Sequence, residues 1–441
     1  MAIRSLCRLP CLLKAGTTER TPGRPWAGNK PVKHGYLSQY FQSVGVKRLS
    51  GVEADVIKSN QHEFNGVEGF RAMFGEPEGK VRYPARFLYL TDQEDQPVSD
   101  EGFLTWYDAR AKARLERGVM RTEYRLYFPT NLVSMCAAEG DLLLIARLST
   151  GSVLAIVAES GTTIERQIQW LFGFGEGAHP GFSVKSELET EQDRIGFAAR
   201  TVLEAIGIEI EDEAPNYLDQ MMDRFGGAFP KTIDFSAYAR GTLNDVHARD
   251  DPDAALVAWM EREEILFRTL EKHLLGEQLQ KLTAAGDAEP DAFIKLVQSA
   301  LQRRKSRAGS ALENHLEQVF GDLGITYTRT GVTENRLKPD FIFPSIPHYA
   351  DVSFPAERLT MLAAKSTCKD RWRQILNEAA RIPLKHLLTL EPSISRNQTD
   401  EMAAEGVQLV IPSPLLPTYT DLQRTWLINV RGFAELALER Q

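Results

Sequence analysis

The sequence has no long apolar run and is poor in cysteine. No segment approaches the ~20 apolar residues that a membrane helix needs, so we expect no membrane association. Cysteine occurs only at Cys7, Cys11, Cys136 and Cys368, and no second Cys or His pair follows the first two at zinc-site spacing. These absences argue against a disulfide framework and a zinc finger, and they predict reduced thiols in a cytoplasmic protein.

An excess of positive charge is also missing. The formal net charge is -8 and the sequence pI is about 5.7, so any nucleic-acid site must be a local basic patch. The hydrophobic fraction of 43% and the charged fraction of 25% are ordinary for a globular protein. A chain of 441 residues exceeds one ordinary core, which predicts two or more domains.

Composition changes along the chain suggest the domain boundaries. The first 33 residues are basic and acid-poor, which predicts a disordered arm or an over-called start codon. The Gly-rich stretch FGFGEGAHPGF (172–182) predicts the start of a linker. We therefore expect four segments: an arm (1–33), a β-rich domain (34–175), a linker and helical region (176–226) and a C-terminal domain (227–441).

Hydrophobic patterns predict the elements of each domain. In the first domain, DLLLIARLS (141–149) and SVLAIVAES (152–160) are strand-like and are joined by Thr150-Gly151, which predicts a hairpin. In the second, a long amphipathic helix is predicted over 251–282 and one or two more over 291–324. Strand-like runs at 340–344, 358–366, 386–390 and 407–412, with a helix over 370–382, then predict an α/β domain around a mixed sheet.

Two acids and a lysine mark a candidate site in this α/β domain. Asp340 opens one predicted strand after Lys338-Pro339, and Lys365 ends another, so their ends can meet if the strands are neighbours. Glu378 is placed on the following predicted helix, from which its carboxylate could swing back to the strand ends, and Glu313 on an earlier helix could add a further carboxylate. Taken alone, an Asp after Pro is usually a turn residue and a helix glutamate is usually solvated, while Glu313 is equally typical of an exposed helix residue.

Carboxylates and a lysine together suit phosphodiester hydrolysis. Asp340 and Glu378 could hold Mg²⁺, which binds few carboxylates and keeps several waters. The metal would offset charge in the transition state, while Lys365 positions the attacking water or the phosphate. Just beyond that lysine, Lys369, Asp370 and Arg371 form a donor–acceptor–donor triplet that could read adjacent G·C pairs in the major groove. A helix N-terminus with solvated charges would look the same.

Three segments resemble the catalytic domain of the EcoRII-type restriction endonucleases: RRKSRAGSALENHLEQVF (303–320), KPDFIFPS (338–345) and MLAAKSTCKDRWRQILNEA (361–379). The resemblance spans roughly residues 227–435. It implies a PD-(D/E)xK restriction-endonuclease-like fold that cuts double-stranded DNA at CCWGG-like palindromes with Mg²⁺. In this family the second acid has moved from the strand to the following helix, so that Ala363 fills the vacated position and Glu378 the new one.

Residue by residue, the resemblance assigns roles to the motif positions. Asp340, Lys365 and Glu378 match the catalytic positions, and Glu313 a helix glutamate that supports the metal site. The triplet at 369–371 matches the base-reading residues. The family also implies a homodimer that flips the central base pair, for which Arg262 and Trp259 are candidates, although Trp259 also suits core packing. A cognate methyltransferase is expected in the same system, but not as a stable partner.

The N-terminal half resembles the same family's effector domain, a B3-like pseudobarrel that binds a second DNA site and regulates cleavage. YFQSVGVKRLS (40–50) and WYDARAKARLERGVMRTEYRLYF (106–128) carry this likeness. Arg110, Arg121, Glu123 and Arg125 lie in the matching stretch, where arginines could meet phosphates and guanines and Glu123 a base amino group.

Two other hypotheses stay open at this point. A catalytically decayed DNA-binding regulator would bind without nicking, and the intact set of Asp340, Lys365 and Glu378 argues against it. A defence or repair nuclease of other specificity would cut at scattered or modified sequences, and the triplet at 369–371 argues against that.

Overall fold

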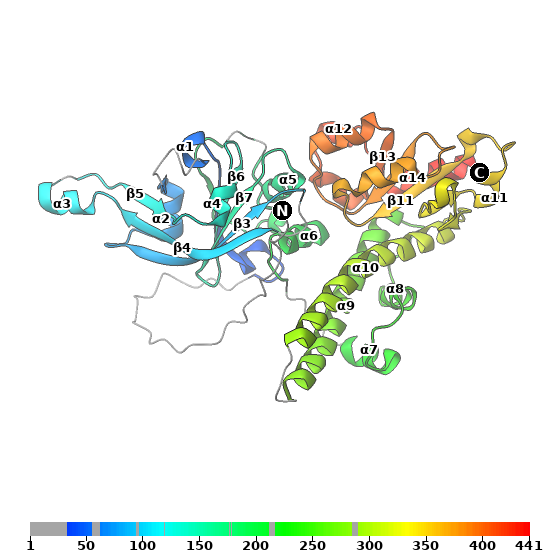
Figure 1. The fold of residues 1–441 in the computed structure, drawn as a ribbon, viewed down its shortest axis with the longest axis horizontal. Helices are drawn as coiled ribbons and strands as arrows, with labels where there is room; N and C mark the ends of the chain where they lie inside the picture. Colours follow the sequence, from blue (N-terminus) through cyan, green and yellow to red (C-terminus); the bar gives the residue numbers. More distant parts are fainter. Residues whose placement is uncertain are drawn as a thin grey trace.

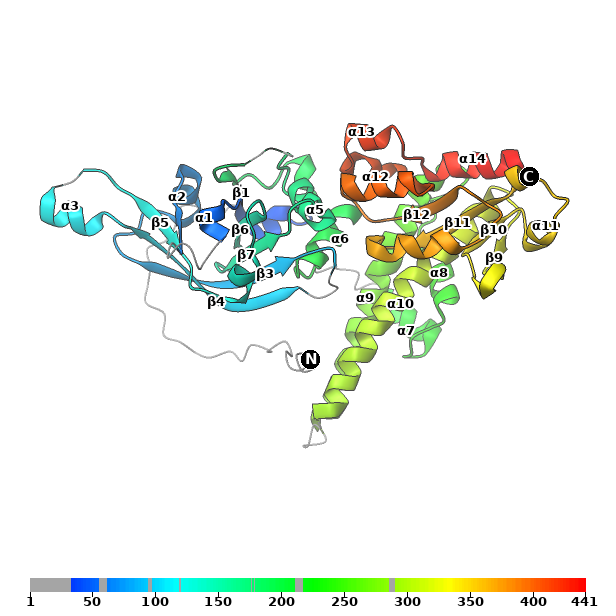
Figure 2. The ribbon, with the colours of Figure 1, turned by 45° about the horizontal axis from the view of Figure 1, so that its top comes forward.

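The computed structural model of the chain describes residues 33–54, 62–93, 97–118, 120–175, 177, 179–210, 217–284 and 290–441, except the side chains of 284 and 369–371. The expected N-terminal arm lies outside the described residues, save for residue 33. Two β-sheets lie at opposite ends of the molecule, and a pair of long helices projects from the C-terminal one (Figures 1 and 2). None of the helices described has the length and apolar character that crossing a bilayer requires.

The N-terminal sheet has eight strands in the order β2-β5-β4-β3-β7-β6-β1-β8. Its neighbours pair antiparallel, except that β3 and β7 are parallel. In chain order the strands are β1 (Phe41–Arg48), β2 (Glu63–Asn65), β3 (Val81–Leu90), β4 (Val98–Asp108), β5 (Tyr124–Tyr127), β6 (Leu142–Leu148), β7 (Val153–Ala158) and β8 (Ser183–Lys185). The predicted hairpin at Thr150-Gly151 is confirmed as β6–β7, with Gly151 at a φ of +89°.

Both faces of this sheet are buried, each by a core cluster of its own. Side chains alternate between the two faces along each strand. On β6, Leu142 and Leu144 join one core cluster, whereas Leu143 and Ile145 join the other. The helices of this half are short, and all but α3 bury side chains: α1 (Gly51–Ala54), α2 (Glu68–Phe74), α3 (Ala111–Arg117), α4 (Leu132–Cys136), α5 (Thr163–Leu171) and α6 (Phe197–Ala205). Of these, α3 projects away from the sheet at the end of the molecule (Figure 1).

The segment predicted to begin a linker contributes to the N-terminal core instead. Phe172 is fully buried there, and β8 adds to the sheet beside β1. Helix α6 then packs Val202 and Leu203 into the same cluster. Gly173, at a φ of +69°, turns the chain directly after Phe172. The described part of 176–226 is thus more than a connection, although its helical content is as expected.

The C-terminal sheet has five strands in the order β13-β12-β11-β10-β9, which confirms the predicted mixed sheet. Strands β11, β12 and β13 run parallel, and β9 and β10 add antiparallel. The strands are β9 (Thr328–Arg329), β10 (Phe341–Phe343), β11 (Thr360–Lys365), β12 (Lys385–Thr389) and β13 (Val407–Val410). The four predicted strand-like runs correspond to β10–β13, and only β9 was not foreseen.

Helices surround this sheet and extend from it. They are α7 (Leu218–Phe225), α8 (Thr232–Gly241), α9 (Pro252–Ala284), α10 (Pro290–Asp322), α11 (Ile346–Ala350), α12 (Arg396–Ala404), α13 (Asp421–Arg424) and α14 (Val430–Arg440). The helices predicted over 251–282 and 291–324 are confirmed as α9 and α10, the second unbroken. They pack together near the sheet and project beyond it (Figure 2).

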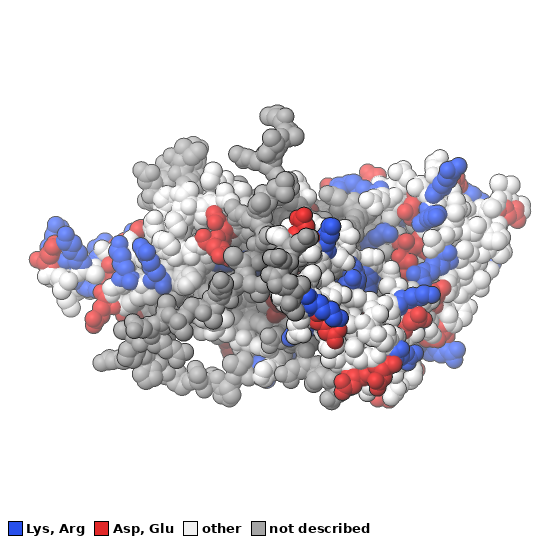
Figure 3. Space-filling model, turned by 60° about the horizontal axis from the view of Figure 1, so that its bottom comes forward, with Lys and Arg blue, Asp and Glu red and all other residues white. Residues whose placement is uncertain are grey.

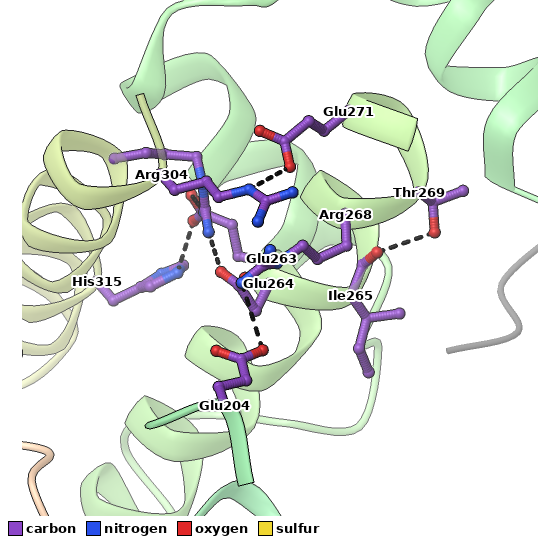
Figure 4. Close-up of polar contacts among 10 residues, drawn as sticks. Glu204, Glu263, Glu264, Ile265, Arg268, Thr269, Glu271, Arg304 and His315 are labelled. Carbon is purple, nitrogen blue, oxygen red and sulfur yellow. Dashed lines mark hydrogen bonds and ion pairs between the residues drawn. The ribbon is translucent and has the colours of Figure 1, made fainter. Parts of the chain in front are cut away.

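A buried polar network joins α9 to α10 where they leave the sheet (Figure 4). Arg307 on α10 forms ion pairs with Glu263 and Glu264 on α9, and it is only 7% exposed. His315 Nε2 lies 2.9 Å from Glu263, while Arg240 donates to His315 Nδ1, which assigns the ring proton to Nε2. Burial lowers the pKa of His315, while the nearby Glu263 carboxylate acts in the opposite direction.

The two halves of the chain contact one another through α5. Its Thr163 hydroxyl donates to Gln398 at 3.1 Å and accepts from the Ser395 amide at 3.2 Å. Gln167 donates to the carbonyl of Pro392 at 3.1 Å. The polar side of α5 therefore faces the C-terminal half, because its apolar side is already buried in the N-terminal core.

Candidate active site

Asp340 and Lys365 meet at the junction of β10 and β11. The two strands are antiparallel, with Phe341 opposite Leu362, so the start of β10 lies beside the end of β11. Lys365 Nζ lies 2.9 Å from Asp340 Oδ2, which also accepts the amide hydrogen of Ala364 at 2.8 Å. The predicted meeting of these strand ends is confirmed, and both side chains keep some solvent access.

Glu378 also reaches this junction, but not from a helix as predicted. The run after β11 is a 3-10 helix, η6 (Lys369–Asn377), and Glu378 caps its end with an extended backbone. Ala379 follows at a φ of +46°, which turns the chain towards β12. The predicted helix over 370–382 is therefore wrong in type and too long, because helical spacing does not distinguish a tight 3-10 run from an α-helix.

Glu313 approaches from α10 and is held by an arginine that sequence reasoning missed. Arg329, on the short strand β9, donates to Glu313 from Nη2 at 3.0 Å. The same guanidinium reaches Asn314 and Glu317 at 2.9 and 2.8 Å. Strand β9 is the neighbour of β10, so this arginine links the helix to the sheet edge beside Asp340.

The three carboxylates interact electrostatically. Burial raises the pKa of Glu378, and the negative charge of Asp340 raises it further, while Lys365 and Lys385 act in the opposite direction. Burial likewise raises the pKa of Glu313, again with Asp340 as the next cause. Half-buried carboxylates that repel one another form a site that a cation would stabilise.

A ready-made cage of metal ligands is not seen. Within the described part of the chain, no group of three or more His, Cys, Asp or Glu side chains is arranged to hold a metal ion. Lys365 and Arg329 instead pair with Asp340 and Glu313. Two carboxylates with several retained waters can be enough to bind a divalent cation such as Mg²⁺ in proteins.

The other site residues predicted in this half have mixed outcomes. The side chains of Lys369, Asp370 and Arg371 lie outside the described residues; their backbone begins η6. Trp259 is 3% exposed and belongs to the main C-terminal core, in agreement with core packing, the alternative to a role in a flipped-base pocket. Arg262 lies over the ring of Tyr217, 4.1 Å from its centroid, and donates to Thr242 at 2.9 Å.

The residues predicted to bind effector DNA gather at the base of α3. Arg110 and Arg125 both form ion pairs with Glu123, and hydrogen bonds from these arginines lower the pKa of that carboxyl. Arg121 is exposed on the following loop. On the face drawn in Figure 3, basic side chains gather at the end of the molecule to which α3 projects.

Comparison with known proteins finds similarity in the C-terminal half of the chain. Residues 267–434 match the family model described as EcoRII C terminal. The chain is also 39% identical over 232 residues to the type II restriction enzyme EcoRII of Escherichia coli. That similarity covers 52% of this chain, and the chain spans 56% of the length of that relative. The predicted family resemblance is thereby confirmed for this region.

Solved structures give fainter similarity. Metal-depleted Ecl18kI in complex with uncleaved, modified DNA has a TM-score of 0.42 and 19% identity, over 52% of this chain and 85% of that one. A complex of the restriction endonuclease PspGI with substrate DNA has a TM-score of 0.39 and 17% identity, over 48% of this chain and 93% of that one.

Proposed function

We propose that this protein is a type II restriction endonuclease that hydrolyses phosphodiester bonds of double-stranded DNA. The observation that carries the proposal is the convergence of Asp340, Lys365, Glu378 and Glu313 on one strand junction, within a region that matches the EcoRII C-terminal family. The fold expected of this half is the PD-(D/E)xK type, and the observed mixed sheet is consistent with it.

Asp340 and Glu378 are the proposed ligands of a divalent cation, Mg²⁺, with Glu313 in support. When bound, the cation supplies a Lewis acid that offsets the charge developing on the phosphoryl oxygens. Lys365 lies within hydrogen-bond distance of Asp340, so its ammonium group can orient the attacking water or the phosphate beside the same carboxylate. Arg329 keeps the Glu313 carboxylate turned towards the sheet edge.

Recognition of a CCWGG-like palindrome is the proposed specificity. The triplet of Lys369, Asp370 and Arg371 begins η6 four residues after the catalytic lysine, which favours base reading next to the scissile phosphate. A palindrome matches the two-fold symmetry of a homodimer, the proposed assembly. Arg262 stays a candidate for a pocket that receives a flipped base.

The N-terminal half is proposed to be a B3-like effector domain that binds a second DNA site. The group of Arg110, Glu123 and Arg125 supports this role because it lies beside α3, the helix that projects from the sheet, where Arg110 is the N-cap residue. Cleavage would then be regulated by occupation of that second site.

Digestion of a plasmid with several CCWGG sites, in Mg²⁺ and in EDTA, tests the proposal. Run-off sequencing should locate metal-dependent cuts at one short palindrome. Binding to the same DNA without cleavage would favour a decayed regulator. Cuts at scattered sequences would favour a defence or repair nuclease and would remove the base-reading role of the triplet at 369–371.

A further inference from the structure

Lys385 is a buried lysine that lies behind the candidate site. It begins β12 and is 5% exposed. Its ammonium group donates to three backbone carbonyls, those of Glu378, Ala379 and Ile382, the last two at 2.7 and 2.6 Å. These bonds use all three of its protons. Among the described residues no carboxylate forms an ion pair with it, so its direct contacts are the oriented carbonyl dipoles, while the negative charges of Glu378 and Glu334 act on it from nearby.

The three carbonyls belong to the turn that carries Glu378. This turn follows the end of η6, where backbone carbonyls lose their helical partners. It also contains the buried Ala379 at a φ of +46°, a conformation that a residue with a Cβ adopts only when its surroundings hold it there. Lys385 satisfies the carbonyls on the inner side of this turn.

Contacts on the outer side complete the clamp. The Glu334 carboxylate accepts the Ala380 amide at 3.4 Å and the Tyr349 hydroxyl at 2.7 Å. The guanidinium of Arg381 donates to the carbonyl of Phe354 at 2.8 Å. Side chains from distant parts of the chain therefore hold the turn, in addition to its internal bond from the Ile382 amide to the Ala379 carbonyl at 2.9 Å.

We propose that Lys385 is a positioning residue which, by capping these carbonyls, fixes the Glu378 carboxylate beside Asp340 so that a divalent cation meets a preformed pair of ligands. The inference rests on the proposed function, since it takes Glu378 as a ligand. The positive charge of Lys385 near Glu378 also opposes the repulsion between Glu378 and Asp340.

Direct Mn²⁺ binding to the full chain, followed by electron paramagnetic resonance, separates this role from simple stabilisation. Lys385→Met should weaken Mn²⁺ affinity about 10- to 100-fold, the usual effect of losing a group that orients a ligand. The control is Lys295→Met, an exposed lysine on α10, 18 residues from Glu313 and so about 27 Å away along the helix; it should leave Mn²⁺ affinity unchanged.

A double-mutant comparison then tests whether Lys385 acts through Glu378. In a Glu378→Gln background, Lys385→Met should weaken Mn²⁺ binding by less than 2-fold, because the ligand it positions is already lost. An equal loss in both backgrounds would overturn the proposal, and so would unchanged affinity in the single variant. If Lys385→Met does not fold, Lys385→Gln replaces it, with the same two readings.

Comparing wild type with Glu378→Gln separates failure of the proposed metal site from failure of the positioning role of Lys385. If wild type and Glu378→Gln bind Mn²⁺ equally, Glu378 is not a ligand and the proposed metal site is wrong. If they differ but Lys385→Met matches wild type, only the positioning role is wrong.

Discussion

At the scale of single residues, the candidate site depends on which charges are paired and which are crowded. Lys365 stabilises the Asp340 carboxylate directly, whereas Glu378 and Glu313 lie close enough to Asp340 for its charge to raise their pKa values. A cation placed among them would relieve that repulsion.

Lys365→Ala should abolish most cleavage without abolishing DNA binding. Loss of one transition-state contact typically lowers kcat about 10²- to 10³-fold. Cleavage is measured in Mg²⁺, and DNA binding by gel shift in EDTA. The matched control is Lys295→Ala, on the exposed face of α10, which should cleave like wild type. A Lys365→Ala variant that still cuts at the wild-type rate would refute the assignment.

His386 should make stability depend on pH. Burial lowers the pKa of His386 from 6.5 to about 4. Between these two pH values the ring is protonated in the unfolded chain and neutral in the folded one. The free energy of unfolding therefore falls as the pH drops below 6.5. Between pH 7 and pH 5 this one group should cost about 2 kcal/mol, at ~1.4 kcal/mol for each unit.

Urea unfolding at pH 7 and pH 5 checks that sign. His386→Leu should remove about 2 kcal/mol of the pH dependence, while His273→Leu, at a part-exposed position on α9, should leave it almost unchanged. An unchanged slope in His386→Leu would show that the ring can be protonated in the folded state.

At the scale of elements, α9 and α10 are joined by buried charges as well as by apolar contacts. Arg307 pairs with Glu263, which is fully buried, and lies over the ring of Phe267 at 4.0 Å. Through Arg268, the same network reaches Glu204 on α6, in the N-terminal half (Figure 4).

Arg307→Met should destabilise the protein by about 3–5 kcal/mol, because it leaves Glu263 buried without its cation. Arg424→Met, which breaks the exposed pair with Asp421, should cost less than about 1 kcal/mol. Urea unfolding at neutral pH measures both. Equal effects would mean that the buried pair contributes no more than a surface one.

At the scale of the whole molecule, the stability of a C-terminal fragment depends on the residue at which the chain is truncated. The fully buried Met221 on α7 packs in one cluster with Phe235 on α8 and Phe267 and Leu270 on α9. A fragment beginning at 227 lacks α7, whereas one beginning at 217 keeps this cluster.

The 217–441 fragment should be more stable than 227–441 by at least about 2 kcal/mol, the usual cost of emptying one buried side-chain position. It should also cleave at least as fast as the full chain if the N-terminal half restrains cleavage. Thermal unfolding and plasmid digestion test the two statements. A well-folded but inactive 217–441 fragment would refute the restraint.

Features that depend on residues close together in the chain could be predicted from the amino-acid sequence. Apolar runs of the right period located β10–β13, α9 and α10, and the β6–β7 hairpin was marked by Thr150-Gly151. The motifs around Asp340 and Lys365 located the candidate site, because the strand ends that carry them needed only to be neighbours.

Contacts between distant segments complete these features, and they are visible only in the folded protein. The turn at Glu378 is held by Lys385 and Glu334, and Glu313 is held by Arg329, none of which any local pattern indicates. Phe172 and β8 joined the N-terminal core although the sequence between them is typical of a linker. These cases share one physical reason. Burial and charge pairing depend on which segments of the chain meet in space, and the hydrophobic periodicity of a segment does not encode its partners.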